Sequence, residues 1–315
     1  MKTVAASLLL MSLVLPVSAW SDKGHMVAAR IAWNKLNDAE RTKVVGLLKK
    51  HPDYQEYLAA DRPKGFSDDE WVFLRAATWA DWIRDKHKDG HDHWHQISYP
   101  YVPHGSKIDP KDHEPPRDQQ NVVTMLPVCV RQVKEGSATE KAKYLAWVFH
   151  LVGDIHQPLH CTSRFDDQFP KGDDNAMDAL VRIDGHDYSL HQWWDSATGN
   201  ETSQASIDAT VKDVDKLLRD HADQVREDME AHKSFESWAR EGFGVAVEWA
   251  YLDGRLKTIP KPKSSSSSSS SSTEAPEAPE NYESNAKRIA KIQLGKAGLR
   301  LTDEIRRILA ALPAD

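Results

Sequence analysis

The chain has 315 residues, of which 28% are charged and 40% hydrophobic, a composition that suits a folded domain and excludes a wholly disordered chain or a membrane bundle. Its 41 Lys and Arg are outnumbered by 48 Asp and Glu, and the formal net charge of −7 argues against nucleic-acid binding through a broad basic face. Fifteen His and only two Cys point away from thiolate zinc fingers and allow sites built from imidazole and carboxylate.

The first residues are typical of a secretory leader. Lys2 precedes an apolar run over residues 4–17, and small residues follow up to Ala19. Because a run of about fourteen residues is too short to span a membrane comfortably, a cleaved signal peptide over residues 1–19 is preferred to a membrane anchor. We therefore expect a secreted protein whose mature chain starts at Trp20, and no later segment is long and apolar enough to span.

Secretion would permit two covalent modifications. An oxidising compartment allows Cys129 and Cys161 to form a disulfide, although Cys129 lies in an apolar helical stretch and could simply be a core residue. Asn200 begins an Asn-Glu-Thr sequon, which a eukaryotic host could glycosylate.

Apolar residues recur mainly at three- and four-residue spacing, which predicts helices. Strand signals are weak and are confined to residues 179–183 and 188–190, on either side of an Asp-Gly turn. We expect one mostly α domain over residues 20–315, with helices over residues 24–36, 39–49, 67–86, 119–135, 139–156, 207–223, 235–252 and 281–312.

One segment departs from this pattern. Residues 264–272 are all Ser, and Glu and Pro repeats follow as far as Glu280. Such a segment cannot bury apolar surface, so residues 261–280 are predicted to form a disordered loop insertion. A linker between domains is the alternative, but the residues after it form a single predicted helix, which is too little for a second domain.

The strongest local signal is a pair of His-x3-Asp motifs. His150 and Asp154 are four residues apart and so share one face of a helix, and His160 follows shortly after. His191 and Asp195 repeat the spacing. Imidazole and carboxylate groups at this spacing can hold a zinc ion. One such pair is usually an ordinary core or surface pair, whereas two pairs and an additional His are a stronger indication of metal.

Three other elements remain open from the residues alone. Trp20 could chelate a metal through its free amine and carbonyl oxygen, five residues before His25, or it could be an ordinary frayed terminus. Asp81 and Arg84 share a helix face. They could take part in a functional site, or they could form an ordinary surface salt bridge. Residues 91–95 carry three alternating His, which would share one face of a strand.

Taken together in chain order, these motifs resemble those of the zinc-dependent, single-strand-specific class I nucleases of fungi, plants, bacteria and trypanosomatids. The family pattern is an N-terminal Trp, a Gly-His, a Trp-Ala-Asp, a Trp-His, then His-x3-Asp-x5-His and Leu-His-x2-Trp-Asp, and all of it is present between Trp20 and Asp195. Residues 298–301 also resemble the family's last helix. The resemblance implies a mostly α phospholipase C/nuclease-type fold with a trinuclear zinc site.

The resemblance also implies the ligands of three Zn²⁺ ions. The first ion would be held by Asp81, His95, His150 and Asp154, the second by Trp20, His25 and Asp154, and the third by His160, His191 and Asp195. The catalytic residues carried over are Asp81, Asp154 and Arg84. Arg84 matches the family arginine that contacts phosphate, and the rival interpretation is that it pairs with Asp81 or Asp85.

Three departures from the family pattern are evident. Ser21 replaces a common Gly, Ser98 replaces an Asp that contacts the base in fungal and plant members, and the serine run is not a general feature. Base preference is therefore open. Tyr99, Tyr101 and Phe165 could each stack an unpaired base, although such a residue is more often part of the core or the rim than a base platform.

The implied activity is that of a secreted, monomeric endonuclease with no membrane partner. It would cleave single-stranded DNA and RNA to 5′-nucleotides and remove phosphate from 3′-nucleotides. A zinc phospholipase C on the same fold is one alternative, although such enzymes use Glu where this chain has Asp195. A non-enzymatic secreted zinc-binding protein is another, and it leaves Arg84, one helical turn from a ligand, unexplained.

Overall fold

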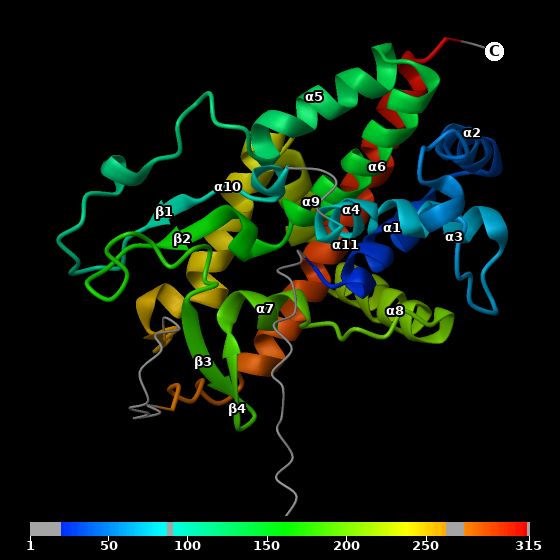
Figure 1. The fold of residues 1–315 in the computed structure, drawn as a ribbon. Coiled ribbons are helices and arrows are strands. Elements are labelled where there is room, and N and C mark those ends of the chain that lie inside the picture. Colours follow the sequence, from blue (N-terminus) through cyan, green and yellow to red (C-terminus); the bar gives the residue numbers. More distant parts are fainter. Residues whose placement is uncertain (1–19, 87–90, 263–273, 314–315) are drawn as a thin grey trace, which may run out of the picture.

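The computed structural model describes residues 20–86, 91–262 and 274–313 (Figure 1). The expected signal peptide over residues 1–19 and the serine run over residues 264–272 lie outside the described residues. The prediction of a mostly α fold is confirmed. Among the described residues, no helix combines the length and the apolar character needed to cross a membrane.

Three helices that pack against one another form the centre of the fold: α1 (Asp22–Lys35), α6 (Ala138–Asp154) and α11 (Tyr282–Ala311). Figure 1 shows α11 running diagonally through the molecule beside α6. The approach of α11 to α1 is close, because a Cβ added at Gly298 would lie 2.6 Å from the Cβ of Ile31. The last helix therefore packs back on the body, as expected for a single domain.

Shorter helices surround this centre. Several begin with a side-chain cap, such as Asn121 of α5, whose Oδ1 accepts hydrogen bonds from the N–H groups of Val123 and Thr124. The surrounding α-helices are α2 (Asp38–Leu48), α3 (Asp68–Ala76), α4 (Trp79–Asp85), α5 (Val122–Glu135), α7 (Leu190–Asp195), α8 (Gln204–Asp220), α9 (Ala222–Ala231) and α10 (Phe235–Val245). Turns of π-helix cover Tyr54–Leu58 and Ala246–Ala250, and turns of 3₁₀-helix cover Asp92–His95, Pro110–His113, Pro158–Cys161 and Leu252–Gly254.

The strands are short. β1 (Tyr99–Tyr101) pairs in parallel with β2 (Thr162–Arg164), and just before this pair the N–H of Ile97 donates to the carbonyl of His160 at 2.8 Å. The pairing holds together two motifs that are far apart in the sequence. A separate antiparallel sheet has β3 (Ala179–Ile183) between β4 (His186–Ser189) and β5 (Ile259–Pro260).

The helix expected over residues 67–86 is divided into α3 and α4, because the Thr78 hydroxyl bonds the carbonyl of Arg75 and the phenol of Tyr57 at the break. The alternating His of residues 91–95, which would share one face of a strand, do not form one. This segment is a 3₁₀-helix in which the consecutive residues Trp94 and His95 are both buried, which an alternating strand with one solvated face would not allow.

The ends of the predicted loop over residues 261–280 make defined contacts. The N–H of Lys261 donates to the carbonyl of Asp178, and the N–H of Ala278 donates to the carbonyl of Arg182. Glu274 forms an ion pair with Arg182 at 2.8 Å. Residues 274–278 therefore run beside β3. A disordered loop could thus occupy only a part of the predicted segment, residues 261–280.

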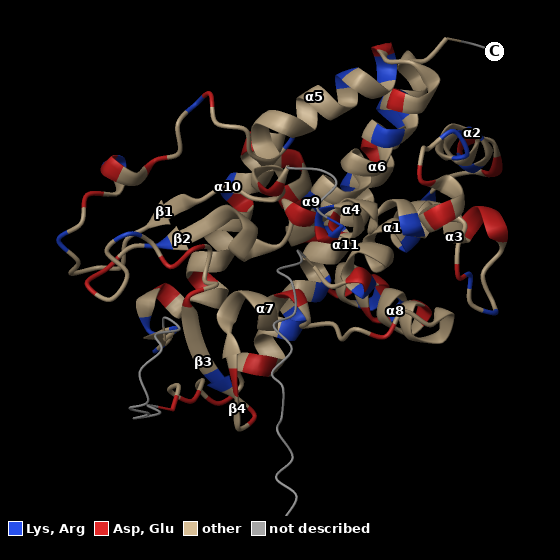
Figure 2. Cartoon of the chain, viewed as in Figure 1, with Lys and Arg blue, Asp and Glu red and all other residues tan. Residues whose placement is uncertain are grey.

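Cys129 and Cys161 are both buried free thiols, so the expected disulfide is not supported. Cys129 belongs to the core of α5, and the Cys161 thiol donates to the carbonyl of Ile155 at 3.5 Å. Asn200 is exposed. Figure 2 shows Lys and Arg interspersed with Asp and Glu along the described helices.

Candidate metal centre

Six separate segments bring the predicted ligand side chains together. α1 carries His25, α4 carries Asp81, and the 3₁₀-turn Asp92–His95 ends at His95. The last two turns of α6 carry His150 and Asp154, the 3₁₀-turn Pro158–Cys161 carries His160, and α7 carries His191 and Asp195. None of these side chains belongs to a residue more than 6% exposed.

The first group is centred on the end of α6. His150 Nε2 lies 3.0 Å from His95 Nδ1 and 3.2 Å from Asp154 Oδ2. His95 Nδ1 is 3.0 Å from the same Asp154 oxygen. Asp81 Oδ1 completes the group at 3.6 Å from His150 Nε2. The four side chains predicted to hold the first ion are therefore neighbours, as the resemblance implies.

The second group uses the other oxygen of Asp154. His25 Nε2 lies 3.3 Å from Asp154 Oδ1, and the His25 ring stacks on that of His150 with 4.1 Å between centroids. The two oxygens of Asp154 thus face different imidazoles, an arrangement suited to a bridging carboxylate. His25, Asp81 and His150 also have donor atoms within 4.8 Å of one another, so Asp81 faces both groups.

Trp20 is held beside these donors. Its side chain is fully buried, and its indole N–H donates to the carbonyl of Gly153 at 3.1 Å. The next N–H, of Ser21, donates to the carbonyl of Asp195 at 2.9 Å. The backbone of Trp20 therefore lies between the ends of α6 and α7, and ligation through its amine and carbonyl remains a prediction.

The third group consists of His160, His191 and Asp195. His191 Nε2 lies 3.0 Å from His160 Nε2 and 3.5 Å from Asp195 Oδ2. The Nδ1 atoms of the two imidazoles point away, to the carbonyls of His95 (2.8 Å) and Asn175 (2.6 Å). Donation from Nδ1–H to these carbonyls leaves each Nε2 lone pair facing the group, which is the orientation that a metal ligand needs.

Two polar residues that support this third group were not predicted. Gln157 donates from Nε2 to Asp195 Oδ1 at 2.7 Å, and its Oε1 accepts from the N–H of Leu159. Asn175, at a positive φ of 53°, orients His191 and accepts from the Ser98 hydroxyl at 2.6 Å. The position of Gln157 within the His-x3-Asp-x5-His motif was an available signal, whereas Asn175 lies in a turn outside every motif.

Two glycines allow α1 to approach α6 at this site. A Cβ added at Gly153 would lie 2.5 Å from His25 Nδ1, and one added at Gly24 would lie 2.7 Å from the Cβ of Trp20. Both distances are shorter than real Cβ contacts, so a larger residue would displace His25 or Trp20.

Burial and mutual contact set the protonation of the donors. Burial lowers the pKa of His25, and it lowers the pKa of His160 to about 4, which favours the neutral imidazole that a metal requires. Burial also opposes the charged form of Asp154, but attraction to His150 outweighs it and holds the pKa of Asp154 well below its ordinary value. Burial works against protonation of His150 as well, yet Asp154 and Asp81 raise its pKa to about 9.

Several of these buried atoms make no hydrogen bond of standard geometry. They are both ring nitrogens of His25, both oxygens of Asp81, Nε2 of His95 and Oδ1 of Asp154. Unsatisfied buried polar atoms are costly, and a divalent cation would supply a partner to those that face one another, such as His25 Nε2 and Asp154 Oδ1. The donors are imidazole nitrogens and carboxylate oxygens, a set that fits zinc among other divalent ions, so these residues could hold metal.

Arg84 lies at the edge of the first group. Its Nη2 is 2.9 Å from Asp81 Oδ1, and its Nε is 3.9 Å from Asp85. The ion pairs weighed as an alternative from the sequence are therefore present. They also hold a planar guanidinium one turn from a donor, which is compatible with the predicted phosphate contact.

Two other histidines and two of the predicted base-stacking residues contact side chains outside the donor groups. His156 accepts at Nε2 from Arg300 at 2.8 Å. His91 stacks on Trp94. Of the predicted base-stacking residues, Tyr101 packs against Tyr251, and Phe165 stacks on His113.

Comparison with known proteins agrees with this arrangement. The family model described as S1/P1 Nuclease matches residues 20–310. Endonuclease 1 of Arabidopsis thaliana is 26% identical over 282 residues, which cover 78% of each chain. Endonuclease 2 of the same plant is 24% identical over 261 residues, or 75% of this chain and 78% of the relative. Because the family match contains every donor described above and nearly the whole described chain, the protein belongs to the S1/P1 nuclease family.

Proposed function

We propose that this protein is a secreted, monomeric, zinc-dependent endonuclease that cleaves single-stranded DNA and RNA to 5′-nucleotides and also acts on 3′-nucleotides. The observation that carries the proposal is the convergence of three groups of buried imidazole and carboxylate donors beside Arg84. Family membership supports nucleic acid as the substrate, and the two Arabidopsis relatives are named as endonucleases.

Three ions would be held by the predicted ligand sets. Asp81, His95, His150 and Asp154 would hold the first, and Trp20, His25 and Asp154 the second. His160, His191 and Asp195 would hold the third. Bound zinc supplies Lewis-acid chemistry, because it lowers the pKa of water, neutralises phosphate oxygens and stabilises a leaving alkoxide.

The side chains around these donors orient the reaction. The planar guanidinium of Arg84 is positioned by Asp81 and would bind a non-bridging oxygen of the scissile phosphate. Gln157 fixes one oxygen of Asp195, leaving the other turned toward His191. Because the donors are buried, a substrate must adapt its shape to bring a phosphate to them. An unpaired, flexible strand can do this more readily than a stacked duplex.

Two features favour this function over its alternatives. The third group ends in Asp195, whereas a phospholipase C of this type is expected to use Glu there. A protein that only sequesters zinc has no need for a guanidinium held 2.9 Å from a ligand carboxylate.

The test is metal analysis of protein that begins at Trp20, together with assays on single-stranded DNA, RNA, 3′-AMP and phosphatidylcholine. We expect three zinc ions per chain and cleavage of both nucleic acids to products with 5′-phosphates. Hydrolysis of phosphatidylcholine without action on single-stranded DNA would assign a phospholipase. Bound zinc without turnover from acid to neutral pH would assign a binding protein.

A further inference from the structure

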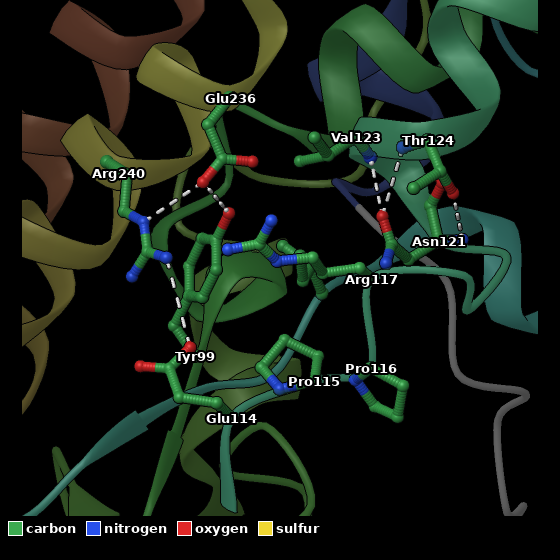
Figure 3. A pocket seen from close by; sticks show the side chains of 11 residues that line it. Tyr99, Glu114, Pro115, Pro116, Arg117, Asn121, Val123, Thr124, Glu236 and Arg240 are labelled. Atoms are coloured by element: carbon green, nitrogen blue, oxygen red, sulfur yellow. Dashed lines mark hydrogen bonds and ion pairs between the residues drawn. The ribbon is translucent and has the colours of Figure 1, made fainter. Parts of the chain in front are cut away.

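A pocket of about 520 Å³ lies behind β1 (Figure 3). None of its lining residues is a predicted ligand. The Ser98 side chain points to Asn175, which contacts His191, whereas the neighbouring side chains of Ile97 and Tyr99 line the pocket. The segment leading into β1 therefore has the third donor group on one face and this pocket on the other.

A stacked pair of side chains forms one wall of the pocket. The guanidinium of Arg240 lies over the ring of Tyr99, 3.5 Å from its centroid. Glu236 joins the two, since it accepts from the Tyr99 hydroxyl at 2.8 Å and from Arg240 Nε at 3.2 Å (Figure 3). Tyr99 is only 2% exposed, so the surface that this stack presents is the planar guanidinium together with Glu236.

The opposite side of the pocket carries Arg117. In Figure 3 its side chain points toward Tyr99 from the loop that precedes α5. Arg117 is exposed, and among the residues that the structure describes no carboxylate forms an ion pair with it. Ile97, Val123 and Pro115 add apolar contact area to the walls.

These groups match the parts of a nucleotide. A planar guanidinium stacks on a nucleobase, and the carboxylate of Glu236 can accept a hydrogen bond from an exocyclic amino group. The unpaired guanidinium of Arg117 is suited to a phosphate. The volume also falls in the usual range for small-molecule pockets, about 300–1,000 Å³.

The pocket and the third donor group lie on opposite faces of one short segment, because Ser98 points to Asn175 whereas Ile97 and Tyr99 line the pocket. A single strand with its scissile phosphate at the donors would pass round this segment, so it could place a nucleotide further along the strand behind β1. We infer that this pocket is a subsite for a nucleotide beyond the scissile bond, with its base on Arg240 and its phosphate on Arg117. The inference rests on the proposed function.

The test uses the metal-loaded enzyme and single-stranded oligonucleotides of increasing length. For the unmodified enzyme, kcat/KM should rise with length until the pocket is filled. Arg117→Gln and Arg240→Gln should reduce kcat/KM on the longer substrates by about five- to tenfold, mainly through KM, and leave the shortest cleavable substrate unaffected. Arg226→Gln is the matched control, since Arg226 is exposed on α9 and pairs with Asp223.

Salt dependence provides a second readout. If Arg117 binds one phosphate of a single strand, Arg117→Gln should reduce the slope of log KM against log salt by about 0.7. An equal loss on short and long substrates would indicate a structural effect and overturn the inference, as would unchanged KM values in both variants. An unmodified enzyme that cleaves no oligonucleotide at all would instead contradict the proposed function.

Discussion

Asp154 offers one carboxylate oxygen to each of two donor groups. Its Oδ1 faces His25, and its Oδ2 faces His95 and His150. Asp154→Asn should therefore remove metal from two groups, with a loss of activity exceeding about 100-fold. Asp195→Asn should affect only the third group. The measurement is metal content per folded chain, and equal losses in the two variants would contradict a bridging role.

Gly153 is predicted to be intolerant of even one added methyl group. Gly153→Ala would place a Cβ 2.5 Å from His25 Nδ1, which should destabilise the protein by about 1–3 kcal/mol and lower its metal content. Gly46→Ala in α2 is the control, because nothing lies within 4 Å of the added Cβ and Ala favours a helix. Chemical denaturation of both variants tests the difference, and similar free energies of unfolding would refute it.

His51 should make stability depend on pH independently of the donor groups. Its Nδ1 accepts from the N–H of Asp53 at 3.0 Å, and burial lowers its pKa to about 4. As pH falls from about 6.5 toward 4, the unfolded chain binds a proton that the folded chain excludes. The free energy of unfolding should therefore decrease over this window, by up to about 3 kcal/mol. Urea unfolding of His51→Gln should show a shallower decline, and an identical decline would exclude His51 as its source.

At the scale of elements, the start of α1 should be sensitive to any preceding residue. Trp20 is fully buried between Gly153 and the end of α7, and its free amine is a predicted ligand. A chain with a short peptide before Trp20 should lose the second ion and most activity. The same peptide after Asp315 is the control. Full metal content and full activity in the extended protein would rule out ligation by the amine.

The elements also show what could be predicted from the sequence. Helical periodicity located α6, and the His-x3-Asp spacing put His150 and Asp154 on one face of it. The division between α3 and α4 was not predictable, because it depends on a contact of Thr78 with the distant Tyr57. The His repeat at residues 91–95 could not show which His faces the donors, because that depends on residues distant in the sequence. His95 lies 3.0 Å from both His150 and Asp154, which belong to α6.

The donor set was predicted by the family resemblance rather than by any single spacing. His25, Asp81 and His95 belong to neither His-x3-Asp pair, and they meet the α6 donors only in the folded chain. Gln157 and Asn175 support ligands without belonging to a metal-binding pattern, so their roles required the structure. The pocket behind β1 was equally hidden, because α10 contributes Glu236 and Arg240 from far along the chain.

At the scale of the whole molecule, metal should contribute to stability as well as to catalysis. The donors come from six segments, and a cation that binds only the folded state joins all of them. Chelation should lower the midpoint of thermal unfolding, with a stabilisation of about 2.7 kcal/mol lost for an ion present at 100 times its Kd. Zinc added back should restore the midpoint, whereas magnesium should not. An unchanged midpoint after chelation would show that bound metal does not stabilise the folded state.

The packing of α11 on α1 has a consequence for the order of folding. His25 lies on α1, and α1 is held in place by α11, with Gly298 against Ile31. A nascent chain that stops before α11 already contains every predicted ligand and still lacks the surface that fixes His25. Completion of the site should therefore follow the synthesis of α11, and removal of α11 should abolish activity without removing any ligand.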